Sequence, residues 1–159
     1  MNLTKLSKVQ AELDLQINLE KQINHAEYLK EKAIALCVEL GELLNERPMI
    51  FKYWSSKQGD KERALTEYID GIHFLLSYGN STNFDFSKFK YKRPKEMDQR
   101  DLILGLFNIF SGLTRIKQFE DALTYYLFLA EKMNFTSEDI EKAYYEKVKI
   151  NYERVENGY

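Results

Sequence analysis

The chain has 159 residues, of which 44% are hydrophobic and 30% are charged, with seven glycines and two prolines. These values exclude a disordered, collagen-like or loop-rich chain, and the length suits one globular domain over residues 1–159. The net charge of −2 provides no general field for holding duplex nucleic acid or an anionic membrane.

Two features favour a soluble protein of the cytoplasm. The single cysteine, Cys37, excludes an intramolecular disulfide and a cysteine-rich zinc site. Residues 1–16 lack the apolar stretch of a signal peptide, and no apolar run reaches membrane-spanning length. We therefore expect a cytoplasmic protein with no membrane partner.

Apolar residues recur at three- and four-residue steps along nearly the whole chain, which predicts an all-α fold of about six helical segments. Thr4 is the expected cap of the first segment, and Gly79-Asn80 is a stop signal for the third. Thr136 begins a strong amino-terminal cap signature for the last. The segments are expected at about residues 4–25, 27–46, 60–78, 98–117, 119–133 and 137–156, with a long surface connection over residues 81–97.

Carboxylates interrupt the second and third helical segments. Glu39, Glu42 and Glu46 share a narrow stripe in AIALCVELGELLNE, and neither Glu39 nor Glu42 has a Lys or Arg at helical spacing. Glu67 and Asp70 likewise project from one side of the next segment. Packing of the two apolar stripes would bring these acidic edges towards each other.

Converging carboxylates form an all-oxygen site, which suits Mg²⁺ or Mn²⁺ together with a polyphosphate. The near absence of His and Cys argues against zinc. From the residues alone, a metal site and a surface acid stripe with interhelical salt bridges remain open alternatives.

Cationic and polar residues follow one face of the last segment. Lys147, Asn151 and Arg154 stand at positions i, i+4 and i+7. Lysine and arginine suit phosphate binding, although cations in the last turns of a helix also stabilise its negative end. Both interpretations are compatible with the pattern.

Three blocks in order closely resemble the dimeric dUTPase family of bacteria and phages. They are ELGELLNE followed by FKYWS, then EYIDGIHFLLSYGN, and finally KVKINYERVENGY. This family belongs to the all-α nucleoside triphosphate pyrophosphohydrolases, with MazG-like proteins as relatives. The resemblance covers nearly the whole chain and implies a bundle with a four-helix core, a homodimer, and Mg²⁺-dependent hydrolysis of dUTP, and of dUDP, to dUMP, with pyrophosphate released from dUTP.

The resemblance also implies a set of site residues. Glu39, Glu42, Glu67 and Asp70 would hold two or three Mg²⁺ ions, with Mn²⁺ as a substitute. Glu42 and Glu39 are the catalytic candidates, with Glu42 as the expected base. Substrate binding is assigned to Gln10, Asp14, Lys52, Trp54, Lys57, Asn80, Lys147, Asn151, Arg154 and Tyr159.

Two neighbouring positions need separate comment. Val148 departs from the family pattern, which usually has Asn there, so the resemblance does not carry over one polar contact at this position. His73 lies one turn after Asp70, but the apolar residues beside it favour a core histidine outside the site.

Other functions share parts of this pattern. A MazG-like pyrophosphohydrolase of different nucleotide choice would use the same four carboxylates, whereas Gln10, Trp54 and the terminal block favour dUTP. A phage-type regulatory protein that binds a repressor belongs to a different class, and nothing in the sequence supports it.

Overall fold

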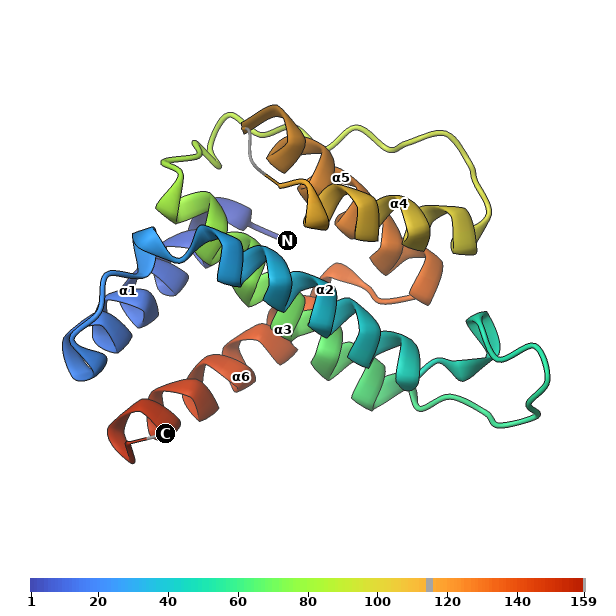
Figure 1. Ribbon diagram of the computed structural model, residues 1–159, viewed down its shortest axis with the longest axis horizontal. Helices are drawn as coiled ribbons and strands as arrows, with labels where there is room; N and C mark the ends of the chain where they lie inside the picture. The colour runs from blue at the N-terminus through green and yellow to red at the C-terminus, as the bar shows by residue number, and fades with distance from the viewer. Residues whose placement is uncertain (114–115, 159) are drawn as a thin grey trace.

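The computed structural model describes residues 1–113 and 116–158, with only the backbone of residues 116 and 117. Within these ranges the chain is all-α, as predicted, and forms a helical bundle without strands (Figure 1). No described helix is both long and apolar enough to cross a bilayer. The helices are α1 (Leu3–Lys21), α2 (Leu29–Asn45), α3 (Lys61–Ser81), α4 (Gln99–Ser111), α5 (Ile116–Met133) and α6 (Ser137–Glu156), with short 3₁₀ helices η1 (His25–Glu27) and η2 (Pro48–Ile50).

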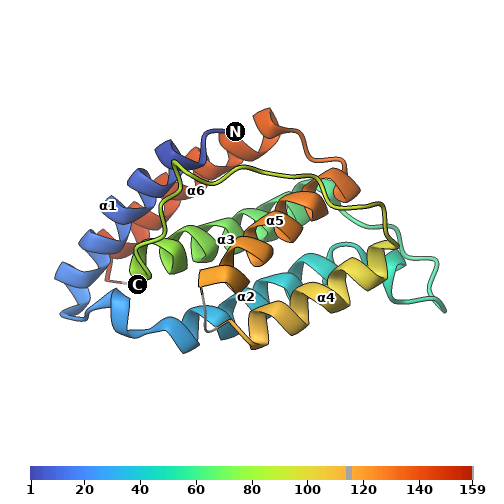
Figure 2. The ribbon, with the colours of Figure 1, turned by 90° about the horizontal axis from the view of Figure 1, so that it is seen from above.

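Helix α3 is the centre of the bundle. Its most extensive interface is with α2, and it also contacts α1, α5 and α6. Helices α1 and α6 lie side by side along one flank of α3, whereas α4 packs against α2 and α5 (Figure 2). This arrangement places the acidic stripes of α2 and α3 beside the carboxyl-terminal half of α6.

One hydrophobic core draws side chains from every helix, because each helix buries its apolar stripe against the others. A fully buried leucine or phenylalanine contributes roughly 1.5–3 kcal/mol relative to an exposed one. Representative members, one from each helix in chain order, are Leu6, Leu36, Ile72, Leu106, Leu123 and Tyr144.

Two buried tyrosines join α3 to α5. The rings of Tyr68 and Tyr126 are stacked, with centroids 4.6 Å apart and planes 4° from parallel. The Tyr68 hydroxyl donates to the Tyr126 carbonyl (3.2 Å), and the Tyr126 hydroxyl donates to the Tyr68 carbonyl (3.1 Å). Gly71 allows this packing, because a Cβ at that position would overlap the Tyr126 hydroxyl.

The helix ends correct several predicted boundaries. Asn2, not Thr4, caps α1, because its side-chain oxygen accepts from the Lys5 amide over 3.0 Å. Helix α1 ends at Lys21, before the predicted residue 25, because Gln22 adopts a left-handed conformation (φ 53°). Helix α6 begins where predicted, with Thr136 and Asp139 forming a reciprocal capping box.

The predicted stop of α3 at Gly79-Asn80 is wrong, because the helix continues to Ser81. Gly79 is buried inside the helix, and a Cβ there would press on the rings of Phe86 and Phe119. The glycine therefore permits close aromatic packing rather than ending the helix.

The long connection between α3 and α4 runs across α5 and is fastened to it (Figure 2). The Arg93 guanidinium forms an ion pair with Glu131 over 2.8 Å, and the Tyr91 hydroxyl donates to the same carboxylate over 2.6 Å. Lys132 also donates to the Met97 carbonyl over 2.9 Å. The connection is thus a surface strap on α5, as its polar composition predicted, and it does not line the acidic cleft described next.

Candidate active site

Three carboxylates converge where α2 crosses α3. Glu39 comes from α2, and Glu67 and Asp70 come from adjacent turns of α3. One carboxylate oxygen from each lies within 4.8 Å of the others, and all three side chains are half-buried. The three-residue spacing on α3 places Glu67 and Asp70 on one face, opposite Glu39 of the neighbouring helix.

Burial and mutual repulsion raise the pKa values of this cluster. Burial, followed by the charges of Asp70, Glu42 and Glu67, raises the pKa of Glu39 to about 7. Burial and then Asp70 raise the pKa of Glu67. Burial also raises the pKa of Asp70, against the opposing hydrogen bond and charge of Lys147. Three crowded carboxylates disfavour their ionised forms, so a cation between them would relieve the repulsion.

Glu42 stands apart from this cluster. It is exposed, and it lines a shallow hollow with Val38 and with Phe51 of the connector that follows α2. Its charge nevertheless contributes to the raised pKa values of Glu39, Glu67 and Asp70, which places it near them. The structure therefore brings three of the four predicted ligands together and leaves the fourth at the edge.

Helix α6 supplies positive charge to the cluster. The Lys147 ammonium donates to Asp70 Oδ2 over 2.6 Å, and both side chains are largely shielded from water. The charge of Arg154 also lowers the pKa of Asp70. Lys147 therefore supplies, from another helix, a cationic partner for the acidic cluster.

A cleft of about 400 Å³ joins Glu39 and Asp70 to a second polar region around Gln10 and Asp14. Five predicted site residues besides Glu39 and Asp70 line it, namely Gln10, Asp14, Lys147, Asn151 and Arg154. Apolar side chains from α1 and α3, Leu13, Ile17 and Phe74, form part of its wall. The cleft thus offers a charged end and an end suited to a flat, partly apolar group.

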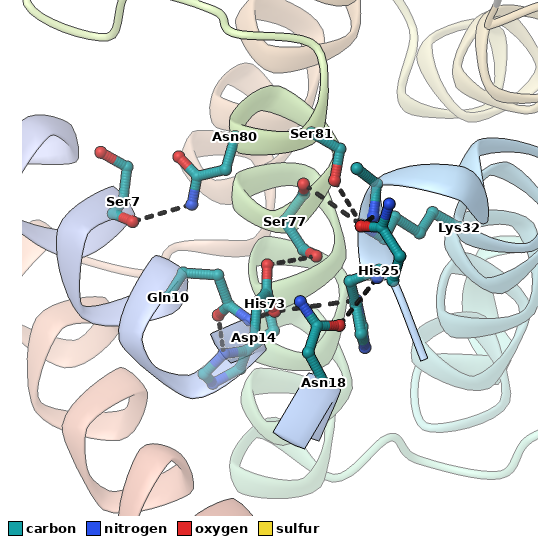
Figure 3. Close-up of polar contacts among 12 residues, drawn as sticks. Ser7, Gln10, Asp14, Asn18, His25, Lys32, His73, Ser77, Asn80 and Ser81 are labelled. Atoms are coloured by element: carbon teal, nitrogen blue, oxygen red, sulfur yellow. Dashed lines mark hydrogen bonds and ion pairs between the residues drawn. The ribbon is translucent and has the colours of Figure 1, made fainter. Parts of the chain in front are cut away.

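The polar region is a buried hydrogen-bond network between α1 and α3 (Figure 3). Asp14 accepts from Gln10 Nε2 over 2.8 Å and from Ser77 Oγ over 2.7 Å. Gln10 Oε1 lies 2.6 Å from His73 Nδ1. Nearby, the Lys32 ammonium donates to Ser81 Oγ over 2.6 Å, and burial lowers its pKa despite the charge of Asp14.

The remaining predicted residues lie elsewhere. Lys52, Trp54 and Lys57 are on the connector between α2 and α3 and do not line the cleft, and Trp54 is 68% exposed. Asn80 also lies outside the lining, since its amide donates to the Ser7 carbonyl over 2.8 Å and joins α3 to α1 (Figure 3). Tyr159 falls outside the described residues.

Sequence reasoning missed four polar residues that line the cleft, Lys21, His25, His73 and Ser77. His73 is buried, as expected of a core histidine, yet it also borders the cleft. His73 lies three residues after Asp70, and Ser77 lies four residues after His73. This helical spacing places both on the face of α3 that carries Glu67 and Asp70. Nothing in the local pattern pointed to Lys21 or His25.

The fold and the cleft define a class, an all-α protein with clustered carboxylates beside a lysine and an arginine in one cleft. The family model described as dUTPase matches residues 2–159, so the chain belongs to the dUTPase family. A search of the curated proteins found no match. Membership confirms the family indicated by the three sequence blocks, and it makes the chain a hydrolase of dUTP, a nucleotide substrate, of the kind that uses a divalent metal.

Proposed function

We propose that the chain is a Mg²⁺-dependent dUTP diphosphatase that converts dUTP to dUMP and pyrophosphate, and dUDP to dUMP and phosphate. The observation that carries this proposal is the convergence of Glu39, Glu67 and Asp70 within 4.8 Å, beside the cationic face of α6. The cleft of about 400 Å³ is lined by Glu39 and Asp70 as well as by Gln10 and Asp14, which suits a nucleotide with its phosphates at the acidic end.

The donor set fits Mg²⁺, or Mn²⁺ in its place. All donors are carboxylate oxygens, the ligands that hard cations prefer, and their raised pKa values indicate charge that a cation would offset. Glu39, Glu67 and Asp70 would hold the metal with Glu42, and the family resemblance suggests two or three ions. When bound, Mg²⁺ supplies a Lewis acid that lowers the pKa of water and offsets the charge of the phosphates.

Helix α6 would bind the phosphate chain. Lys147 offers a point charge and Arg154 a planar fork, which together suit phosphate oxygens. Asn151 lies between them on the same face of α6 and adds an amide donor. These residues would counter the charge of the substrate, which the carboxylates alone would repel.

Glu42 is the proposed general base. It is exposed and close enough to the cluster for its charge to raise the pKa of Glu39. An ionised carboxylate in that position would take a proton from the attacking water. Glu39 would orient the same water from the buried side of the cluster.

Substrate contacts from Lys52, Trp54, Lys57, Asn80 and Tyr159 stay predictions from the family resemblance. In one protomer the three connector residues lie outside the cleft, so their contribution requires movement of the connector or a second subunit.

We also propose that the chain is one domain over residues 1–159 and works as a homodimer. The shared core of all six helices supports the first proposal. Exposed apolar side chains on the adjacent helices α2 and α4 support the second, because Ile34 is 64% and Leu104 67% exposed. Light scattering of the wild type and of an Ile34→Glu, Leu104→Glu variant tests the dimer, which the variant should weaken.

The decisive experiment measures pyrophosphate release from dUTP with Mg²⁺ for the wild type and for Glu42→Gln. Turnover should fall by several orders of magnitude with the helix content unchanged. Glu31→Gln, an exposed change at the other end of α2, is the matched control and should keep full activity. Equal turnover of wild type and Glu42→Gln would remove Glu42 from the chemistry.

The substrate panel separates the competing functions. Preference for dUTP over dCTP, dTTP and UTP is expected, and phosphate release from dUDP tests the second substrate. Broad or different preference would favour a MazG-like enzyme, and no turnover of any nucleotide would favour a regulatory binding protein.

A further inference from the structure

Tyr126 of α5 contacts the backbone of α3 at the turn that carries Glu67 and Asp70. Helix α5 lies beside α3 (Figure 2), yet none of its described residues lines the acidic cleft. The Tyr126 side chain is fully buried, and its hydroxyl donates to the Tyr68 carbonyl over 3.1 Å. The same hydroxyl lies against Gly71, where a Cβ would overlap it.

These two backbone contacts flank the acidic pair in the sequence. Tyr68 directly follows Glu67, and Gly71 directly follows Asp70. Successive helical residues point about 100° apart, so one face of this turn meets Tyr126 while another presents both carboxylates to the cleft. A contact that fixes the backbone on the first face therefore fixes the points from which both carboxylates project.

The position of the Tyr126 hydroxyl is itself determined by several contacts. The Tyr68 ring stacks on the Tyr126 ring, and the Tyr68 hydroxyl donates back to the Tyr126 carbonyl over 3.2 Å. The Phe110 ring of α4 packs against Tyr126 with centroids 5.9 Å apart. A buried tyrosine hydroxyl needs a hydrogen-bond partner, and here that partner is a backbone atom of α3.

The bond from Tyr126 is additional to the helical hydrogen bonds of α3. In an α-helix the Tyr68 carbonyl accepts from the amide four residues later, that of Ile72, so the helix can form without Tyr126. The second donor on the same carbonyl instead ties this turn to α5. The tie opposes the mutual repulsion of the acidic cluster, which contributes to the raised pKa of Glu67 after burial.

We propose that Tyr126 is a positioning residue of the Mg²⁺ site, which holds the α3 turn so that Glu67 and Asp70 keep the geometry that the cation requires. This inference rests on the proposed function and deepens it. Mg²⁺ demands a nearly ideal octahedral arrangement of ligands, whereas Ca²⁺ accepts a flexible one. Loss of the contact should therefore weaken Mg²⁺ binding more than Ca²⁺ binding.

Calorimetry of Mg²⁺ and Ca²⁺ binding to the wild type and to Tyr126→Phe tests the role. The variant keeps the ring and the carbonyl that accepts from Tyr68, and removes only the hydroxyl that touches α3. Mg²⁺ should bind about 10-fold more weakly, the lower end of the loss seen when a group that orients metal ligands is removed. Ca²⁺ should lose less than about threefold.

Tyr78→Phe is the matched control. Tyr78 is also a buried tyrosine of α3, and its hydroxyl donates to a backbone carbonyl, that of Leu113, over 2.9 Å. This variant loses the same kind of bond away from the acidic pair, so both affinities should stay as in the wild type. Unchanged Mg²⁺ affinity in Tyr126→Phe, or an equal loss for both cations, would overturn the positioning role.

Hydrogen exchange of the wild type keeps the inference testable if Tyr126→Phe does not fold. The Ile72 amide, which bonds to the Tyr68 carbonyl in the helical pattern, should exchange as slowly without Mg²⁺ as with it. Exchange that becomes much slower on addition of Mg²⁺ would show that the cation, and not Tyr126, orders the turn. A wild type that binds no Mg²⁺ would contradict the proposed metal site as well, whereas the outcomes above overturn the role of Tyr126 alone.

Discussion

His73 should make the folded protein sensitive to mild acid. Its pKa falls from the ordinary value of 6.5 to about 3, mainly because burial disfavours the charged ring. Above about pH 6.5 the ring is neutral in both the folded and the unfolded chain, so it adds no pH dependence. Below that value the unfolded chain binds a proton that the folded chain refuses, and stability falls as the pH falls towards 3.

The size of the effect follows from the proton linkage. Each pH unit below 6.5 costs about 1.4 kcal/mol, so lowering the pH from 7 to 5 should remove about 2 kcal/mol of the free energy of unfolding. His73→Phe abolishes this titration while leaving a ring in the same place. Glu39 has the opposite effect on stability, because its raised pKa favours proton binding by the folded state. This effect is present in both the wild type and His73→Phe, so it cancels when the two are compared.

Urea unfolding followed by circular dichroism, at pH 7 and pH 5 in chelator, measures the difference. The wild type should lose about 2 kcal/mol more than His73→Phe between the two pH values. Equal losses would mean that the buried ring accepts a proton in the folded state, which would refute the reasoning from burial.

Two further predictions concern the helices that position the site. Gly71→Ala should destabilise the fold by about 1–3 kcal/mol, because the new methyl group collides with Tyr126, and a lowered midpoint of thermal unfolding checks it. Thr136→Ala should lower the free energy of unfolding by about 1 kcal/mol, because it removes one half of the capping box of α6. Urea unfolding measures this loss, and an unchanged midpoint would show that the cap does not contribute to stability.

Helical periodicity was sufficient to predict the architecture, but helix ends depended on tertiary contacts. The capping box at Thr136 is a local interaction, so the sequence located the start of α6 correctly. Gly79 is different, because its role is set by Phe86 of the connection after α3 and by Phe119 of α5, which lie outside its own helix. A local stop signal was outweighed there by aromatic packing.

The acidic cluster was predictable because its spacing is a property of single helices. Glu67 and Asp70 share a face whatever surrounds them, and the apolar stripes dictate which helices meet. The partner of Asp70 was not predictable, because Lys147 approaches from a helix 77 residues away. His73 was placed in the core on its apolar neighbours, and only the three-dimensional network reveals its orphaned ring nitrogen.

The positive charge that α6 brings to the acidic cluster has a consequence for synthesis of the protein. Translation releases α6 from the ribosome after the helices that carry Glu39, Glu67 and Asp70. Until α6 is released, Lys147 cannot neutralise these carboxylates, so their repulsion would oppose the packing of α2 on α3. Docking of α6 therefore couples the synthesis of this helix to neutralisation of the acidic cluster.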